Sequence, residues 1–178
     1  MSFRKEKKFA LSYSDLQEIK KKMFNLGMEK LFPSRIINNC YFDTKNLNIF
    51  FDSEEGVLPR KKIRVRWYEK KLEFKKEVKV SSIEGRYKYD DLLTSIKSID
   101  DIKKLFFFDN EYGDLYPILT THYEREYFML KKLRITFDKN ISYFNLRKGS
   151  TINYKDKECV MEIKTSIDCG EDYIKNIV

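Results

Sequence analysis

The sequence predicts an α+β fold: an eight-stranded antiparallel β-barrel, or tunnel, with a charged interior and a few flanking helices. Apolar and polar residues alternate with period two in many segments, whereas helical periodicity is confined to short stretches. Charged residues make up 36% of the chain, well above the usual quarter, and many of them fall inside the alternating segments. The alternating segments amount to about eight strands, a number that closes comfortably into a barrel.

The strands are predicted from this alternation, because successive residues of a strand point to opposite faces of its sheet. Six segments alternate clearly: 3–11, 62–68, 72–80, 121–130, 132–138 and 158–165. Two shorter candidates cover 36–42 and 46–51. The short connection between 62–68 and 72–80 indicates a hairpin, and therefore antiparallel pairing.

Three helices are predicted. The first covers 14–26, with Ser14 or Asp15 as its N-cap and apolar residues at helical spacing. Two more, at 90–96 and 100–107, each open with an aspartate, which favours a helix N-terminus.

Composition limits the possible partners and the domain organisation. A chain of 178 residues is long enough for one domain with a core, so we expect a single domain over 1–178. The net charge of +8 favours anionic partners. The three cysteines have no zinc-type spacing, and no apolar run is long enough to span a membrane. Without a signal-like N-terminus, we expect a cytoplasmic protein.

The charged residues share strand faces. In 62–68, Ile63, Val65 and Trp67 share one face. The opposite face of this strand holds Lys62, Arg64, Arg66 and Tyr68. The same division recurs in the first strand and in 72–80, 133–137 and 160–164.

Two interpretations of these faces stay open at this point. An antiparallel sheet often has one face in water, and this alone produces alternation. Alternatively, a barrel with an apolar exterior under helices holds its charges inside, where unpaired charges need a charged ligand. The inward cations would be Arg4, Lys8, Arg64, Arg66, Lys75, Arg125, Arg134 and Lys164, and the inward acids Glu6, Glu73, Glu77 and Glu162. The positive surplus suits a triphosphate, and the acids suit Mg²⁺ or Mn²⁺.

Seven short motifs in order resemble the VTC domain, the polyphosphate polymerase branch of the triphosphate tunnel metalloenzymes, also described as CYTH-like. They extend from residue 3 to about residue 166, and none of them is specific alone. The motifs are Arg4–Phe9, Tyr41–Thr44, Lys62–Arg66, Glu73–Lys75, Tyr123–Arg125, Leu133–Asp138 and Met161–Lys164.

The resemblance implies an eight-stranded tunnel that binds a triphosphate and a divalent metal, and transfer of the γ-phosphate of ATP to a growing polyphosphate chain. It implies that the phosphates are held by Lys8, Arg64, Arg66, Lys75, Arg125 and Arg134. Glu162 would hold the metal, Mn²⁺ or Mg²⁺, with help from Glu6 and Glu73. Arg4 and Lys164 are further candidates for contact with the bound ligand.

The chain departs from the family pattern at its end. Relatives continue past the Glu-x-Lys strand into a helix and a segment with another tunnel lysine, whereas this sequence ends at Val178. The resemblance therefore predicts a tunnel that lacks this lysine or replaces it with another group.

Other function classes are less well supported. An inorganic tripolyphosphatase, or another triphosphate hydrolase, is the alternative enzyme. A polyanion or nucleic-acid binding module with a degraded site is the alternative without catalysis, although nucleic acid is the less favoured partner. The single histidine, His122, is expected to lie at a surface or strand end rather than act as a base. No glycine-rich phosphate loop is present, and the oligomeric state is left open.

Overall fold

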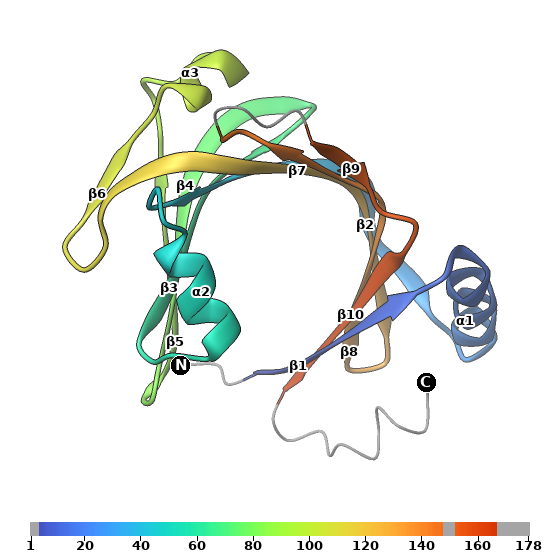
Figure 1. Cartoon of the computed structure of the whole chain (residues 1–178). Coiled ribbons are helices and arrows are strands. Elements are labelled where there is room, and N and C mark those ends of the chain that lie inside the picture. The colour runs from blue at the N-terminus through green and yellow to red at the C-terminus, as the bar shows by residue number, and fades with distance from the viewer. Residues whose placement is uncertain (1–3, 148–151, 167–178) are drawn as a thin grey trace. The chain divides into compact units, whose positions relative to one another are not determined.

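The structure, a computed structural model, describes residues 4–147 and 152–166 (Figure 1). Its three helices are α1 (Tyr13–Asn25), α2 (Asn48–Glu55) and α3 (Ile99–Lys103). The first five strands are β1 (Arg4–Leu11), β2 (Glu29–Asp43), β3 (Arg60–Tyr68), β4 (Lys71–Ser82) and β5 (Gly85–Leu92). The others are β6 (Phe107–Asp109), β7 (Gly113–Leu130), β8 (Leu133–Asn145), β9 (Asn153–Lys155) and β10 (Cys159–Ser166).

The predicted antiparallel sheet with few helices is confirmed. The strands form one ten-stranded sheet in the order β1-β10-β8-β7-β2-β3-β4-β5, with β6 beside β7 and β9 beside β8. No hydrogen-bonded pairing joins β1 to β5 among the described residues, so closure into an eight-stranded barrel is not confirmed.

The chain divides into two compact units. The first contains residues 1–36, 123–141 and 155–178, and the second contains residues 37–122 and 142–154. Strands β2 and β7 each contribute residues to both. The expectation of a single domain over 1–178 stays a prediction.

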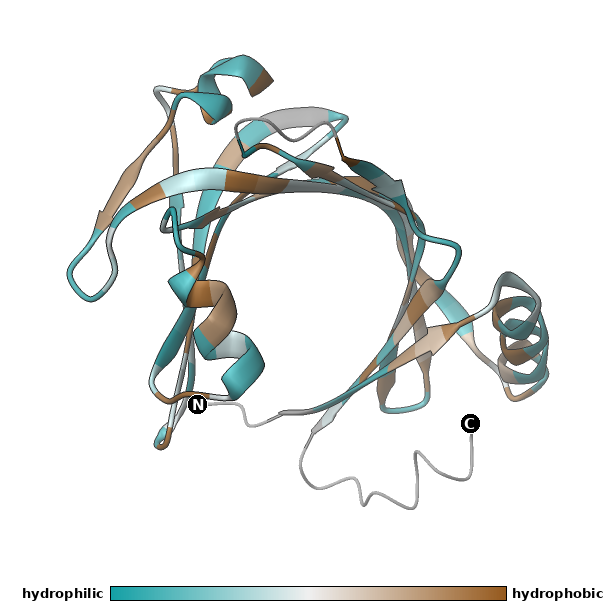
Figure 2. Ribbon diagram, in the orientation of Figure 1, coloured by the Kyte–Doolittle hydropathy of each residue, from teal (hydrophilic) through white to brown (hydrophobic). Residues whose placement is uncertain are grey.

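The core of the first unit lies between α1 and one face of its strands. Leu16 and Met23 of α1 are fully buried there. The strands contribute Phe128, Leu130, Leu133, Ile135, Phe137, Cys159, Met161 and Ile163. The predicted helix exists, but its N-cap is Ser12, whose hydroxyl accepts the backbone N–H of Asp15 at 3.1 Å. In the hydropathy colours of Figure 2, α1 mixes hydrophilic and hydrophobic residues, as expected for a helix with one buried side.

The core of the second unit lies on the apolar face of β3 and β4. Ile63, Val65 and Trp67 of β3 are buried, as their alternation predicts. They pack with Cys40, Phe42, Ile49, Phe74, Val78, Ile96, Ile102 and Leu115. The opposite face of these strands carries the polar side chains described below.

The predicted strand at 46–51 is wrong, because most of this segment belongs to α2. The carboxylate of Asp43 accepts the backbone N–H groups of Ile49 and Phe50, both at 2.9 Å, which satisfies donors at the helix start. Gly56 ends the helix in the left-handed conformation, with φ 73°. Figure 2 shows hydrophobic residues in the first half of α2 and hydrophilic residues at its end.

The two later helices also differ from prediction. The helix predicted at 90–96 is wrong, because Asp90 and Asp91 belong to β5, which pairs with β4. The helix predicted at 100–107 is shorter and earlier. Ser98 and Asp101 form a capping box at its start, and Phe107 lies in β6.

Within the described part of the chain, no helix combines the length and the apolar character needed to cross a membrane.

Candidate functional site

The first unit has a charged face on the side of its strands away from α1. Across β1, β10 and β8, Glu6 pairs with Lys164, and Lys164 pairs with Arg134. In the neighbouring row, Lys8 pairs with Glu162. Met161 and Ile163, which alternate with Glu162 and Lys164 along β10, point into the core under α1. We call the first charged face the side chains of Glu6, Lys8, Arg125, Arg134, Asp138, Glu162 and Lys164.

Glu162 is the most buried carboxylate of this face, with 6% of the residue exposed. It contacts the ammonium group of Lys164, which also lies 3.7 Å from Glu6. Burial opposes ionisation of Glu162, but Lys164, Arg125 and Lys8 outweigh it and hold its pKa below the ordinary value. Glu162 is therefore a buried, ionised carboxylate.

Arg125 is held by Asp138 on the neighbouring strand β8. Its Nε and Nη2 groups donate to the two carboxylate oxygens of Asp138, both at 2.6 Å. Nη2 also lies 4.0 Å from Glu162. Burial disfavours the charge, yet Asp138 raises the pKa of Arg125, so the guanidinium stays ionised.

Two cations of this face are more accessible. Arg134 is exposed and forms no ion pair with any described residue. Lys8 has 60% of its side chain exposed and lies 3.5 Å from Glu6. Arg4 belongs to β1, but its side chain lies outside the described part of the structure.

The second unit has its own charged face, opposite its apolar core. Arg64 donates from Nε and Nη2 to Glu77 at 2.8 and 2.6 Å, and from Nη1 to the Tyr41 hydroxyl at 3.3 Å. Arg66 donates from Nε to the side-chain carbonyl of Asn39 at 2.8 Å. We call the second charged face the side chains of Asn39, Tyr41, Arg64, Arg66, Lys75, Glu77 and Lys88.

Glu77 is the central anion of this second charged face. Its carboxylate accepts from Lys88 at 2.9 Å and lies 3.9 Å from Arg66, in addition to its contact with Arg64. Burial raises the carboxyl pKa, but Arg66, Arg64 and Lys88 overcome this effect and lower it to about 2. Three cations therefore share one buried carboxylate, which leaves the cluster positive.

Lys75 is the second lysine of this face, and unlike Lys88 it does not contact Glu77. It lies directly opposite Arg66 in the β3–β4 register and therefore on the same face. Among the described residues, none forms an ion pair with it. Glu73 lies on the same strand, in the second unit, whereas Glu6 and Glu162 lie in the first.

Several contacts of these faces do not follow from the sequence pattern. Alternation places Asp138 on a polar strand face, but it does not predict the ion pair of Asp138 with Arg125. Lys88 was missed because β5 was not predicted, although Arg86, Lys88 and Asp90 alternate with Tyr87 and Tyr89 there. His122 hydrogen-bonds through Nδ1 to Asn38 at 2.8 Å, which gives the histidine a structural role in its strand.

A divalent cation fits the chemistry of the first charged face, although the described residues contain no group of three or more acidic, histidine or cysteine ligands. Glu6 and Glu162 both reach the ammonium of Lys164, so their oxygens converge on a cation already. Mg²⁺ commonly uses one or two carboxylates together with substrate phosphates and water. This pair meets that requirement.

The family profile of the VTC domain matches residues 3–177, nearly the whole chain. No curated protein shows significant sequence similarity to it.

Several solved structures share the fold of this chain. A proposed adenylate cyclase from Bacillus halodurans has 14% identity and a TM-score of 0.58, with 99% of this chain and 86% of that chain covered. A proposed adenylate cyclase from Vibrio parahaemolyticus has 16% identity and a TM-score of 0.55, with coverage of 99% and 85%. A proposed adenylyl cyclase from Hippeastrum, described as having dominant triphosphatase activity, has 14% identity and a TM-score of 0.54, with coverage of 98% and 84%. At these identities the likeness concerns the fold.

Proposed function

Because the chain belongs to the VTC domain family, we propose that it catalyses metal-dependent phosphoryl transfer from a triphosphate, with ATP as donor and polyphosphate as acceptor. Each charged face, taken by itself, offers cations for phosphate oxygens. The observation that carries the proposal is that arginines cluster on the strand faces opposite the apolar cores and are held there by buried carboxylates.

The phosphate-binding roles differ between residues. Arg64 and Arg125 are already oriented by Glu77 and Asp138, so their guanidinium planes are fixed before a ligand binds. Lys75 and Arg134 have no ion pair with a described residue, which leaves their charges for phosphate oxygens. Oriented guanidinium groups and cations without an ion pair can both stabilise the charge that develops on a transferring phosphoryl group.

The reaction requires little covalent help from the protein. A terminal phosphate oxygen of the acceptor attacks the γ-phosphorus of ATP and forms a new P–O bond. The bond from that phosphorus to the β–γ bridging oxygen breaks, and ADP leaves with the electron pair. The chain's own residues position both phosphates and neutralise their charge.

The metal would be held by Glu162, with Glu6 as its neighbour. When bound, Mn²⁺ or Mg²⁺ would neutralise charge on the phosphate oxygens and fix their orientation. Lys164 would then be released from the two carboxylates and could itself contact phosphate. Glu73 belongs to the second unit, and we assign it no metal contact here.

Hydrolysis of a triphosphate is the second candidate, and the Hippeastrum protein of the same fold favours it. Water then replaces the acceptor, loses a proton to solvent and releases orthophosphate. The same cations would serve both reactions. The reactions differ in the acceptor of the phosphoryl group, which is polyphosphate in one and water in the other.

Phosphorus NMR of the products tests this proposal. The full chain is incubated with ATP and Mn²⁺, and separately with tripolyphosphate and Mg²⁺. A polymerase yields ADP and a growing signal of internal phosphates. A hydrolase yields orthophosphate together with ADP from ATP, or with pyrophosphate from tripolyphosphate, and no growing chain. If neither substrate is consumed above a metal-free control, the proposed activity is wrong.

A further inference from the structure

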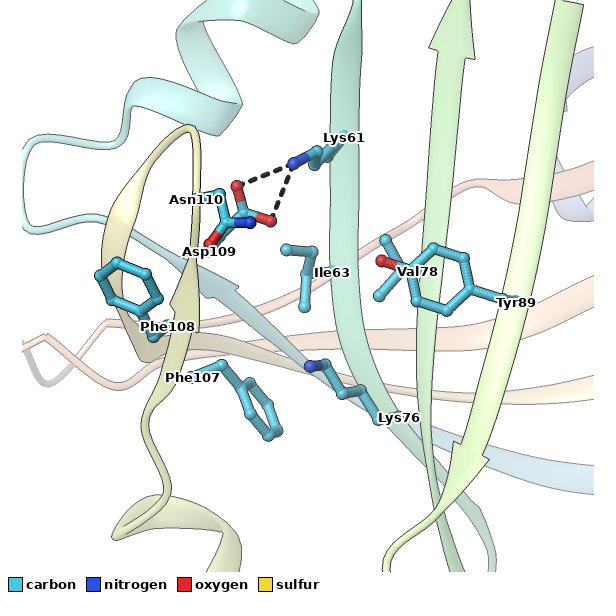
Figure 3. A pocket seen from close by; sticks show the side chains of 9 residues that line it. All are labelled: Lys61, Ile63, Lys76, Val78, Tyr89, Phe107, Phe108, Asp109 and Asn110. Atoms are coloured by element: carbon cyan, nitrogen blue, oxygen red, sulfur yellow. Dashed lines mark hydrogen bonds and ion pairs between the residues drawn. The ribbon is translucent and has the colours of Figure 1, made fainter.

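The second unit contains a pocket of about 250 Å³ on the apolar side of β3 and β4, away from the second charged face. Ile63 and Val78, both buried, form its floor (Figure 3). Figure 3 shows Phe107 and Phe108 on one side of the pocket and Tyr89 on the other. The phosphate-binding proposal uses none of these residues.

The two ends of the pocket differ in charge. At one end the ammonium of Lys61 lies 2.8 and 2.9 Å from the carboxylate oxygens of Asp109, and 3.3 Å from Glu111 (Figure 3). Asp109 also accepts the backbone N–H groups of Glu111 and Tyr112, at 3.0 and 3.3 Å. Both oxygens of the Asp109 carboxylate, the only one that lines this end of the pocket in the described structure, are therefore already bonded to a cation.

Lys76 at the other end has a different environment. It interrupts the apolar face of β4, with Val65 and Asp91 as its cross-strand neighbours. Its ammonium lies 4.3 Å from the centre of the Phe107 ring, yet it forms no ion pair with any residue in the described ranges. A half-buried ammonium beside an aromatic ring and without an ion pair is suited to a charge-assisted hydrogen bond with a carboxylate or phosphate.

We propose that this pocket binds a small aromatic anion. Its carboxylate or phosphate group would contact Lys76, and its ring would lie beside the exposed rings of Phe108 and Tyr89, above the buried Ile63 and Val78. The volume suits a single-ring molecule, since pockets for drug-sized ligands begin at about 300 Å³. The amide of Asn110, at the Lys61 end, can hydrogen-bond a polar substituent on the ring (Figure 3).

Titrations monitored by ¹H–¹⁵N NMR test this site on the full chain. The probes are benzoate and phenyl phosphate, with benzylamine as the cationic control of similar size, and the amide signals of Tyr89 and Phe108 report the pocket. At least one aromatic anion should bind saturably with a dissociation constant below about 1 mM, and benzylamine should not. Saturable binding of both anions would show that the pocket accepts aromatic carboxylates and aromatic phosphates. Binding of only one would show which of the two anionic groups it selects.

Variants separate this pocket from the charged faces. Lys76→Met retains the apolar stem and should weaken binding at least tenfold, whereas Lys104→Met, on the exposed surface after α3, should not change it. Phe108→Ala changes a residue that is 67% exposed, so it should weaken binding without affecting folding. Glu162→Gln should leave binding here intact, even if it abolishes turnover.

The proposal is overturned if neither aromatic anion shifts the Tyr89 and Phe108 signals saturably. It is also overturned if Lys76→Met and Phe108→Ala both bind the anions as tightly as the unaltered chain. Failure of phosphoryl transfer in the product assay would leave these outcomes unchanged, so the two proposals fail separately.

Discussion

Arg125 and Asp138 form a two-point ion pair across β7 and β8, in which both donated hydrogen bonds are 2.6 Å long. Two parallel bonds fix the plane of the guanidinium group as well as its position. Arg125 is therefore a preorganised cation, and Asp138 positions it. This pair provides a test of whether the charged faces bind phosphate or only hold the sheet together.

We expect Asp138→Asn to lower kcat/KM for tripolyphosphate or ATP by about 10- to 100-fold, because Arg125 loses its fixed orientation. Steady-state kinetics at several Mg²⁺ concentrations measure the effect. Asp114→Asn, an exposed position at the start of β7, serves as the matched control. A purely structural role for Asp138 would instead lower the melting temperature and leave the activity of the folded fraction unchanged.

Glu162→Gln should reduce metal-dependent turnover by more than about 100-fold, because an amide is a much weaker ligand for a divalent cation than a carboxylate. Glutamine has nearly the same size as glutamate, so circular dichroism of the variant should show an intact fold. Glu124→Gln is the control, since Glu124 lies 3.8 Å from Lys139, away from the first charged face. Normal turnover by Glu162→Gln would remove the metal assignment.

Lys75→Met and Arg64→Met should differ in their effects on stability. Both should weaken tripolyphosphate binding by ~1.5–3 kcal/mol, the scale of a charge-assisted contact. Only Arg64→Met should also lower the free energy of unfolding, because it leaves the buried Glu77 without its closest partner. Calorimetric titration and urea unfolding measure the two quantities. Equal binding by Lys75→Met and the unaltered chain would show that Lys75 does not face the ligand.

The pKa of Glu77 predicts how stability depends on pH. Because the folded pKa is about 2, below the ordinary value of 4.5, the ionised carboxylate stabilises the fold above pH 4.5. This contribution, on the order of 3 kcal/mol, is lost as pH falls from about 4.5 to about 2. Unfolding free energies over this range should therefore fall less steeply in Glu77→Gln than in the unaltered chain. Parallel curves would mean that Glu77 is not the group responsible.

Alternation predicted much of the sheet because the buried and polar faces of β3, β4 and β10 follow period two closely. It assigned Arg64, Arg66 and Glu162 to polar faces, and the structure places them opposite the apolar cores. The closed barrel was expected from the strand count, but a count does not determine which edge strands pair. The polymerase reaction came from the family resemblance and not from any pattern of period two.

The secondary structure predicted from the sequence was wrong where a side chain from outside the segment stabilises another conformation. At 46–51 the apolar residues suit either a strand or a helix, and the carboxylate of Asp43 decides for the helix by accepting two of its N–H groups. The sequence could not reveal that Asp138 holds Arg125 or that Glu77 holds Arg64 and Lys88, because these pairs depend on strand register. Register is set by long-range pairing, and it decides which charges meet.

The central claim is that the charged faces bind a metal-bound triphosphate. Isothermal titration of the full chain with tripolyphosphate, with and without Mg²⁺ at physiological salt, tests it most directly. We expect saturable binding of tripolyphosphate that is tighter with Mg²⁺, that loses this metal dependence in Glu162→Gln, and that weakens at least tenfold in Arg134→Met, a second variant of the first charged face. Binding that is absent, or that is equal in all these variants and independent of Mg²⁺, would contradict it.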